Sequence, residues 1–295
     1  MMQSHVIDAW GVRLHVEEMG SGTPVVLLHG FTGSTRAMTC IAEGLSDTYR
    51  TLSIDLVGHG RSAVPDDVDA YSMTACVAQL GAVLEELDVR AAHWIGYSMG
   101  GRVALSFGVA HPEQMMSALL IGASAGVRDL EMRAARILDD EALAERIERD
   151  GVEAFVDFWT SQPLLVDERR LGARGVAEAR EMRLANSTQG LAGSLRGMGA
   201  GAQPPMHDAL PDLRVPVCLA VGEDDLKFSA IAAELSQKLP NPRVEFVLEA
   251  GHAAHTDNPT AFLELARRFL ADAEAWNKTS HCAAKAASTT QTRTT

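Results

Sequence analysis

A serine, an aspartate and a histidine that could form a catalytic triad follow three separate predicted strands. Ser98 lies in Gly96-Tyr-Ser-Met-Gly100, directly after an apolar strand predicted over Ala92–Tyr97 and before a helical stretch that begins at Gly100. A G-x-S-x-G pattern between a strand and a helix is typical of a nucleophile elbow, whose sharp turn exposes the serine hydroxyl. Such a serine is reactive only when a histidine and an orienting carboxylate accompany it.

Candidate partners for Ser98 come later in the chain, in the order aspartate then histidine. Gly222-Glu-Asp-Asp225 follows a predicted strand, and Gly251-His-Ala-Ala-His255 follows the next one. Open α/β sheets place their sites at the carboxyl ends of strands, where both segments lie. The residues alone leave Asp224 and Asp225 open as the acid, and His252 and His255 as the base.

A glycine loop after the first apolar strand could stabilise negative charge. In His29-Gly-Phe-Thr-Gly33, the backbone N–H of Phe31 could pair with that of Met99 to form an oxyanion hole. The alternative interpretation is a plain glycine-rich turn. Three other histidines are interpreted as hydrogen-bonding groups of loops and of a strand end: His29, His59 and His93.

Short apolar strands alternate with amphipathic helices along the chain. Beyond an N-terminal hairpin over Val6–Met19, strands are predicted at Pro24–Leu28, Thr51–Asp55, Ala92–Tyr97, Ala118–Gly122, Val215–Val221 and Val244–Leu248. Apolar residues at helical spacing follow Met73, and another such stretch follows Asn258-Pro259. The alternation predicts an α/β fold with a mostly parallel sheet covered by helices on both faces.

The alternation divides the chain into four segments. Residues 124–212 have helical patterns without a convincing strand, and are therefore predicted to form a helical cap inserted into the core. The core itself is predicted in two parts, residues 1–123 and 213–276. Residues 277–295 are rich in Ala, Ser and Thr and are predicted to be a disordered tail.

Composition and charge exclude several classes of function. The 295 residues carry a net charge of −13, which disfavours nucleic acid and anionic membrane surfaces as partners. No apolar run approaches the roughly 18 residues of a membrane span, and the N-terminus does not resemble a secretory signal. The four cysteines are too far apart to suggest a zinc site or a disulfide scaffold. We therefore expect a cytoplasmic protein.

The arginines point to an anionic substrate. Arg102 lies four residues after Ser98 and so shares its face of a helix that packs on the sheet. A guanidinium there is costly unless an anion meets it, although it could also extend to solvent. The predicted cap holds 11 of the 22 arginines; most are expected in solvated ion pairs with glutamates, and one or two could point inward.

The sequence resembles the family of 2-succinyl-6-hydroxy-2,4-cyclohexadiene-1-carboxylate synthases, lyases of menaquinone (vitamin K2) biosynthesis with the α/β-hydrolase fold. The resemblance runs from about Pro24 to Leu270. It rests on the segments His29–Gly33, Gly96–Ala104, Arg133–Arg136, Trp159 with Gln162-Pro163, Gly201–Pro204, Gly222–Phe228 and Ala250–His255.

This resemblance implies roles for individual residues. The family's triad falls on Ser98, Asp225 and His252. Its substrate-binding arginines fall on Arg102, Arg136 and Arg183, with Arg180 a possible alternative to Arg183, and Tyr97 and Trp159 match positions that line its pocket. The implied ligand is a small polycarboxylate, and neither a metal nor an organic cofactor is expected.

The resemblance also implies a reaction, the elimination of pyruvate from 2-succinyl-5-enolpyruvyl-6-hydroxy-3-cyclohexene-1-carboxylate. The main alternative is a serine hydrolase of carboxylic esters, or of carbon–carbon bonds in ring-fission diketones, which uses the same triad. Arg102 and the cap arginines favour the lyase, because a hydrolase of neutral esters needs no such charges. An intact triad disfavours a third possibility, a binding protein without catalytic activity.

Overall fold

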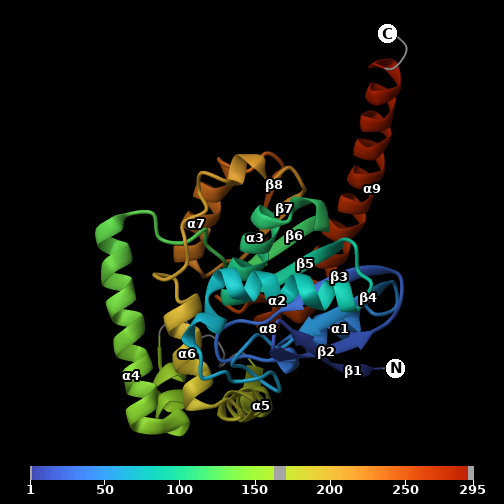
Figure 1. Cartoon of the computed structure of the whole chain (residues 1–295). Helices are drawn as coiled ribbons and strands as arrows, with labels where there is room; N and C mark the ends of the chain where they lie inside the picture. Colours follow the sequence, from blue (N-terminus) through green and yellow to red (C-terminus); the bar gives the residue numbers. More distant parts are fainter. Residues whose placement is uncertain (1, 163–170, 292–295) are drawn as a thin grey trace.

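An eight-stranded sheet forms the centre of the computed structural model, which describes residues 2–162 and 171–291, with side chains as far as Thr279 (Figure 1). Its strand order is β1-β2-β4-β3-β5-β6-β7-β8. The first two strands pair antiparallel, and β3 to β8 are parallel. The strands are β1 (Gln3–Ala9), β2 (Val12–Met19), β3 (Thr23–Leu28), β4 (Tyr49–Ile54), β5 (Ala92–Tyr97), β6 (Met115–Ile121), β7 (Val217–Gly222) and β8 (Pro242–Val247).

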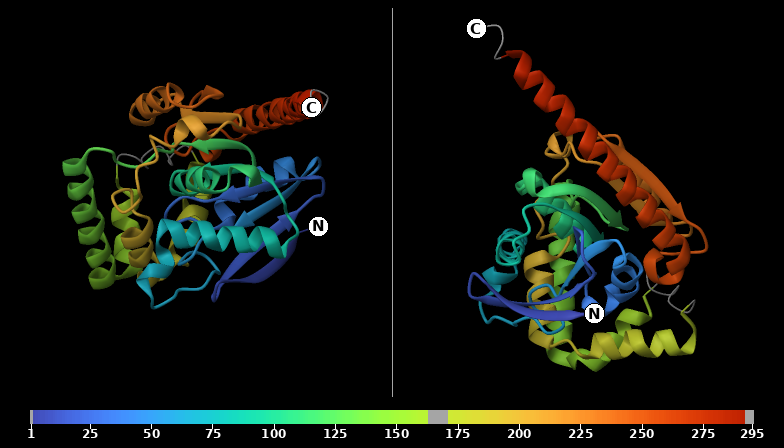
Figure 2. Two further views of the ribbon diagram at one scale, coloured as in Figure 1. Left: turned by 45° about the horizontal axis from the view of Figure 1, so that its top comes forward. Right: turned by 90° about the vertical axis from the view of Figure 1, so that its right-hand side faces the viewer.

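Helices cover both faces of the sheet, because each buried strand presents apolar side chains to both sides. Alternate residues of β3 enter two cores: Val26 and Leu28 lie in one, Val25 and Leu27 in the other. The first core is covered by α2 (Met73–Glu86), α3 (Met99–Ala110) and α7 (Leu226–Ser236), and the second by α1 (Thr39–Leu45), α8 (Ala254–Asp257) and α9 (Pro259–Gln291). The two views of Figure 2 show these layers, and the α/β fold predicted from the sequence is confirmed.

Residues 124–212, which we call the cap, lie beside the sheet (Figure 1). Their described part contains α4 (Leu130–Thr160), α5 (Gly172–Leu184), α6 (Thr188–Met198) and turns, but no strand. Gly151, with a positive φ of 83°, divides α4 into two helical segments. Ile147, Phe155 and Leu191 help form a small core of the cap, against which Phe31 of the glycine loop also packs. The cap is thereby seated directly on the loop that was expected to bind negative charge.

The C-terminal segment differs from the predicted disordered tail. Helix α9 continues from the core through residues 277–291 and projects past the sheet (Figure 2), while residues 292–295 lie outside the described part. The Asn277 side chain donates a hydrogen bond to the Met116 carbonyl (3.2 Å) where α9 leaves the core. An established helix extends without a new nucleation step, and alanine, frequent here, is the best helix former. Composition alone therefore underestimated the helix.

None of the described helices is long and apolar enough to cross a membrane. Cys40, Cys76 and Cys218 are free thiols, and the Cys282 side chain lies outside the described part.

Candidate active site

Ser98 occupies the turn between β5 and α3. Its backbone has φ 49° and ψ −107°, a region that L-residues rarely adopt, and its N–H donates to the Ile121 carbonyl of β6 (2.8 Å). The turn needs glycine at 100, because a Cβ there would collide with the Leu28 carbonyl at the end of β3. The strained turn thus holds the hydroxyl above the carboxyl edge of the sheet, as expected of a nucleophile elbow.

Two side chains from the neighbouring strand ends complete a hydrogen-bonded chain with Ser98. His252 Nε2 lies 3.1 Å from Ser98 Oγ, and His252 Nδ1 lies 2.8 Å from Asp225 Oδ2. Both partners of Ser98 are buried: His252 is 4% exposed and Asp225 is 7% exposed. The geometry therefore selects His252 over His255 as the partner of Ser98, and Asp225 over the exposed Asp224 as the partner of His252.

The Asp225 carboxylate is held in its ionised form. Burial tends to raise its pKa, but hydrogen bonds from His252 and from the Phe228 N–H (3.1 Å) outweigh burial and keep the pKa below its usual value. An ionised Asp225 accepts the Nδ1 proton of a neutral imidazole and so leaves Nε2 as an acceptor for the Ser98 hydroxyl. This is the arrangement that makes a serine a base or a nucleophile.

The glycine loop 29–33 lies beside the elbow, held from below by a histidine. His29 Nδ1 donates to the Gly30 carbonyl (2.8 Å), and its Nε2 accepts the Leu56 N–H (3.0 Å). Gly33 N–H closes the turn on the Gly30 carbonyl (3.0 Å). The loop is thus rigid, and Met99 opens α3, where first-turn N–H groups lack acceptors within the helix. Both features support the proposed oxyanion pair, Phe31 and Met99.

Four buried histidines outside the triad have a pKa below the usual value for histidine. Burial is the main cause that lowers the pKa of His29 and His93 to about 4, and of His59 and His255 to about 3. His59 donates from Nδ1 to the Val57 carbonyl (3.2 Å), and His93 contacts Ser117 Oγ (2.7 Å). His29, His59 and His93 therefore have the structural roles expected from the sequence.

Because these four histidines have lowered pKa values, we expect the free energy of unfolding to decrease in acid. Their folded pKa values are below the unfolded value of about 6.5, so the unfolded chain binds more protons as the pH falls. Stability should therefore decline below about pH 6.5 and continue to decline towards pH 4, each histidine costing about 2 kcal/mol at pH 5. Urea unfolding at pH 7.5 and pH 5.0 measures the loss. His59→Asn, which keeps the Val57 hydrogen bond, should make this loss of stability between pH 7.5 and pH 5.0 smaller. The control His111→Asn, at a more exposed position, should leave the loss as it is in wild type. An unchanged pH dependence of stability in His59→Asn would contradict this account.

Arg102, one helical turn beyond Ser98, contacts the cap. Its Nη1 donates to the Met198 carbonyl at the end of α6 and to Gln203 Oε1, both at 2.8 Å. Burial, with a smaller contribution from Arg136, lowers the pKa of Arg102 to about 10. The expectation that its guanidinium would be unpaired without substrate is therefore wrong, since the cap supplies two acceptors.

Arg136 lies near Arg102, and a buried carboxylate accompanies the two. Arg136 Nε donates to Asp140 Oδ1 (2.8 Å), and the Asp140 side chain is only 6% exposed. Asp140 also attracts the Arg102 charge. Neither Asp140 nor Gln203 was predicted as a partner of these arginines; the i,i+4 spacing of Arg136 and Asp140 was the available signal for the first.

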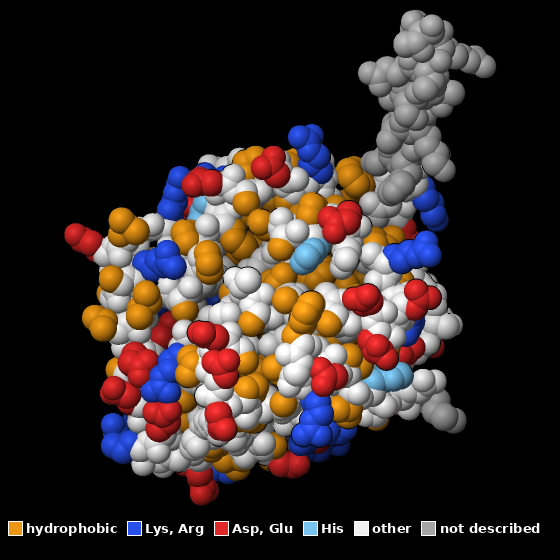
Figure 3. Space-filling model, viewed as in Figure 1, with side chains coloured by type: hydrophobic (Ala, Val, Ile, Leu, Met, Phe, Trp, Pro, Cys, Tyr) orange, Lys and Arg blue, Asp and Glu red, His pale blue; other side chains and the backbone are white. Residues whose placement is uncertain are grey.

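Arg183 and Arg180 lie one turn apart on α5 but in different surroundings. Arg183 is buried, 7% exposed, and lines a cavity beside Tyr97. Arg180 is paired at the surface with Asp157 (3.0 Å) and Glu153 (3.4 Å). Acidic and basic side chains also lie close together on the surface over α4 (Figure 3). There Arg196 of α6 binds Glu141 and Glu148 of α4. The placement favours Arg183 as the ligand-binding arginine.

Aromatic rings pack against His252 and against the glycine loop. Tyr97 lies between His252 (ring centroids 5.4 Å apart) and His255 (4.6 Å). Trp159 of the cap meets the Phe31 ring edge-on at 5.4 Å. Among the described residues, no group of His, Cys, Asp and Glu side chains is arranged to hold a metal ion.

Comparisons with known proteins show which family the chain resembles. The family model of the α/β hydrolase fold matches residues 23–259. A Bacillus subtilis (strain 168) protein with the provisional name 2-succinyl-6-hydroxy-2,4-cyclohexadiene-1-carboxylate synthase is 40% identical over 88% of this chain and 95% of its own length. The Klebsiella pneumoniae protein of that name is 32% identical over 84% of this chain and 93% of its own.

Solved structures show the same relationship. The structure of MenH from S. aureus superposes with a TM-score of 0.84 at 28% identity, covering 88% of this chain and 98% of its own. A thermophilic esterase from Thermogutta terrifontis superposes with a TM-score of 0.80 at 25% identity, and the match covers 92% of this chain and 99% of the esterase chain. The fold is therefore shared with hydrolases, and side chains rather than backbone distinguish the members.

Proposed function

The chain belongs to the α/β-hydrolase fold family and, within it, to the 2-succinyl-6-hydroxy-2,4-cyclohexadiene-1-carboxylate synthases, and we infer from this that its triad eliminates pyruvate from 2-succinyl-5-enolpyruvyl-6-hydroxy-3-cyclohexene-1-carboxylate. It is thus a carbon–oxygen lyase of menaquinone biosynthesis. The observation that carries the inference is the intact chain Ser98–His252–Asp225 in a molecule that also buries Arg183.

The geometry gives each triad member a task in an elimination. Ser98 Oγ passes its proton to His252 Nε2 as it removes the ring proton next to the succinyl carbonyl. The electron pair moves to the carbonyl oxygen, where the N–H groups of Phe31 and Met99 stabilise the charge. Expulsion of the enolpyruvyl oxygen then forms the ring double bond, and the leaving enol takes a proton from His252 and becomes pyruvate. No bond between Ser98 and substrate is needed.

A substrate with three carboxylates fits a site with three arginines. Arg102 and Arg136 lie near each other, and Arg183 lines the cavity that Tyr97 also lines. Bidentate guanidinium groups are well suited to carboxylates, and a chain of net charge −13 repels such a substrate unless cations gather locally. The free thiols of the core fit a reducing cytoplasm, where we place the reaction.

The decisive assay follows pyruvate release from the enolpyruvyl substrate, with hydrolysis of a neutral nitrophenyl ester measured in parallel. A lyase should release pyruvate with a kcat/KM far above that for the ester. Ester hydrolysis without pyruvate release would instead favour the hydrolase alternative.

Arg102→Ala should separate binding of the anionic substrate from catalysis. We expect kcat/KM for pyruvate release to fall by an amount that corresponds to a loss of roughly 2–4 kcal/mol in transition-state binding free energy. This is the range for a charge-assisted contact in a desolvated site. Lysine should restore only part of the loss, because a single ammonium lacks the bidentate fork. The free energy of unfolding of the variant should also be lower by about 1–3 kcal/mol, because the Met198 carbonyl and the Gln203 side chain lose a hydrogen-bond donor.

Arg13→Ala is the matched control for charge, because Arg13 is an exposed residue of β2 on the far hairpin. It should leave kcat/KM unchanged. Equal losses on the anionic substrate and on the neutral ester in Arg102→Ala would show that Arg102 serves the structure alone.

A further inference from the structure

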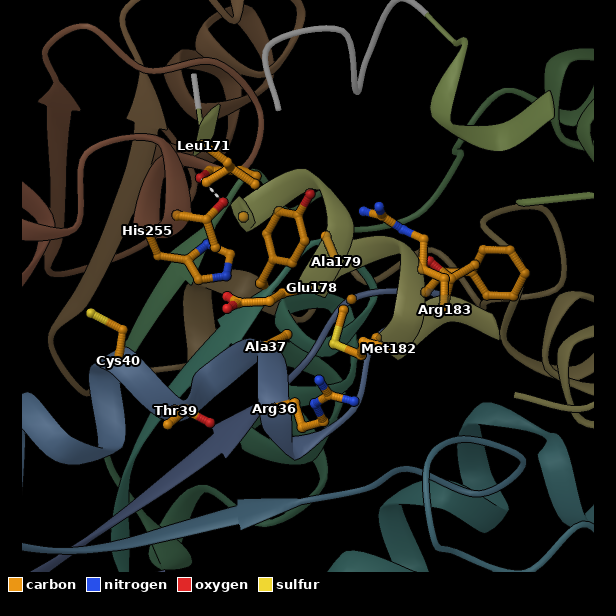
Figure 4. A pocket seen from close by; sticks show the side chains of 18 residues that line it. Arg36, Ala37, Thr39, Cys40, Leu171, Glu178, Ala179, Met182, Arg183 and His255 are labelled. Carbon is orange, nitrogen blue, oxygen red and sulfur yellow. Dashed lines mark hydrogen bonds between the residues drawn. The ribbon is translucent and has the colours of Figure 1, made fainter. Parts of the chain in front are cut away.

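A cavity of about 370 Å³ lies between the core and the cap, with Tyr97 in its wall. On the core side its wall is the glycine loop 30–33 and the start of α1, and on the cap side it is α5 (Figure 4). The loop carries the Phe31 N–H, which the proposed function assigns to the oxyanion. The shape of the loop therefore decides where this N–H points.

One residue of the glycine loop has a strained backbone. Thr32 has φ 68°, in the left-handed region that a β-branched residue rarely adopts. Such a conformation persists only where the surrounding structure imposes it. Thr32 is also only 1% exposed, so its carbonyl needs a hydrogen-bond donor from the protein. The donor that meets this carbonyl is thus one of the contacts that hold the loop in shape.

This donor is Asn186 of the cap, in the turn between α5 and α6. Its Nδ2 donates to the Thr32 carbonyl (2.9 Å) and to the Arg183 carbonyl (3.1 Å), and its Oδ1 accepts the Gly60 N–H (3.2 Å). The partners settle which way the amide faces, because a reversed amide would turn its oxygen towards two carbonyls. Asn186 is 7% exposed and joins the cap to two loops of the core.

Two peptide groups connect Asn186 to the Phe31 N–H. The Thr32 carbonyl shares its peptide group with the Gly33 N–H, which donates to the Gly30 carbonyl (3.0 Å). The Gly30 carbonyl in turn shares its peptide group with the Phe31 N–H. A trans peptide group is planar, and its C=O and N–H point in opposite directions. Fixing each carbonyl therefore fixes the direction of the N–H on its other side.

We propose that Asn186 is a positioning residue, which aligns the Phe31 N–H with the oxyanion through this relay of two peptide groups. The inference rests on the proposed function, which places the oxyanion at Phe31. Hydrogen bonds in a chain also polarise one another, so Asn186 should make the Phe31 N–H a stronger donor. Because Asn186 belongs to the cap, the oxyanion site is complete only when the turn between α5 and α6 is seated on the core.

Asn186→Ala and Asn186→Asp test the relay. Both remove the donor to Thr32, and aspartate keeps the volume and the acceptor for Gly60. His29 still supports the Gly30 carbonyl (2.8 Å). We therefore expect kcat for pyruvate release to fall roughly tenfold to hundredfold, less than on complete loss of an oxyanion donor. The substrate Kd should stay within roughly threefold, because such a donor acts on the transition state. A merely structural role would lower stability and leave the kcat of the folded enzyme unchanged.

A second readout does not depend on the lyase reaction. Diisopropyl fluorophosphate is a neutral reagent for activated serines. Ser98 Oγ attacks its phosphorus, fluoride leaves, the hydroxyl proton passes to His252, and the phosphoryl oxygen takes the oxyanion position. Mass spectrometry gives the rate constant of this labelling. It should fall about tenfold or more in both Asn186 variants.

Gln189→Ala is the matched control, because the exposed Gln189 of α6 also joins the cap to the core, at the Pro65 carbonyl (3.3 Å) and at Asp66 (2.8 Å). It should leave kcat and the labelling rate unchanged, and circular dichroism should show the variants folded. If Asn186→Ala does not fold, Asn186→Asp decides alone.

Unchanged kcat and labelling in the folded Asn186 variants, a change in Kd alone, or an equal loss in Gln189→Ala would each overturn the proposal. A wild type that the reagent does not label would refute the oxyanion site and the proposal with it. Slower labelling of the variants, when the wild type releases no pyruvate, would instead refute the proposed function and retain the positioning role of Asn186.

Discussion

Ser98→Ala should abolish pyruvate release and leave substrate binding almost intact. The hydroxyl is the group that takes the ring proton, and no other described side chain is hydrogen-bonded to His252 Nε2. We expect kcat to fall roughly 10³-fold or more, as for triads whose members act as a unit. Binding should persist because the arginines and the cavity walls are untouched. Single-turnover kinetics and the substrate Kd of the variant measure the two effects separately.

Ser106→Ala provides the control on the same helix, because the Ser106 hydroxyl bonds the Arg102 carbonyl two turns from the elbow. Its kcat should remain within a few-fold of wild type. Mass spectrometry during turnover adds a second test, since the elimination requires no covalent intermediate on Ser98. Near-normal pyruvate release by Ser98→Ala would refute the triad assignment, and a stable acyl adduct would favour the hydrolase alternative.

Asp225→Asn should reduce kcat on the order of 10⁴-fold, by analogy with the acid of serine proteases. An amide nitrogen next to His252 Nδ1 favours the tautomer with its proton on Nε2, which then faces Ser98 Oγ and cannot accept its proton. The fold should survive, because the amide oxygen can still accept the Phe228 N–H that caps α7. The pH profile of kcat and the melting temperature measure the two effects.

Asp224→Asn is the neighbouring control. The Asp224 residue is exposed, and its backbone N–H donates to the Ala250 carbonyl (3.0 Å), a bond that the substitution preserves. We expect little change in kcat. The reverse ranking of the two variants would show that Asp224 orients His252.

Much of the architecture could be predicted from local patterns. Buried parallel strands such as β3 and β5 are short apolar runs with clear ends, and the elbow joins a strand and a helix through a glycine-flanked serine, all within residues 92–110. The cap was visible because a long helical stretch without strands breaks the alternation. Local propensity failed after Trp276, where continuity with α9 prevailed over a composition typical of disorder.

The amino-acid sequence by itself determined the elements, the chain order of serine, aspartate and histidine, and the presence of arginines near the elbow. Those features follow from spacing within a strand or a helix, which is set by backbone geometry. Only the tertiary structure shows that Asp224 and Asp225, His252 and His255, and Arg180 and Arg183 have different surroundings, because each pair has the same chemistry within three residues. The choice depends on which side chain faces a partner up to 154 positions away, as His252 faces Ser98. The pairing of Arg102 with Gln203 and the cavity between α1 and α5 arise in the same way, where the cap closes on the core.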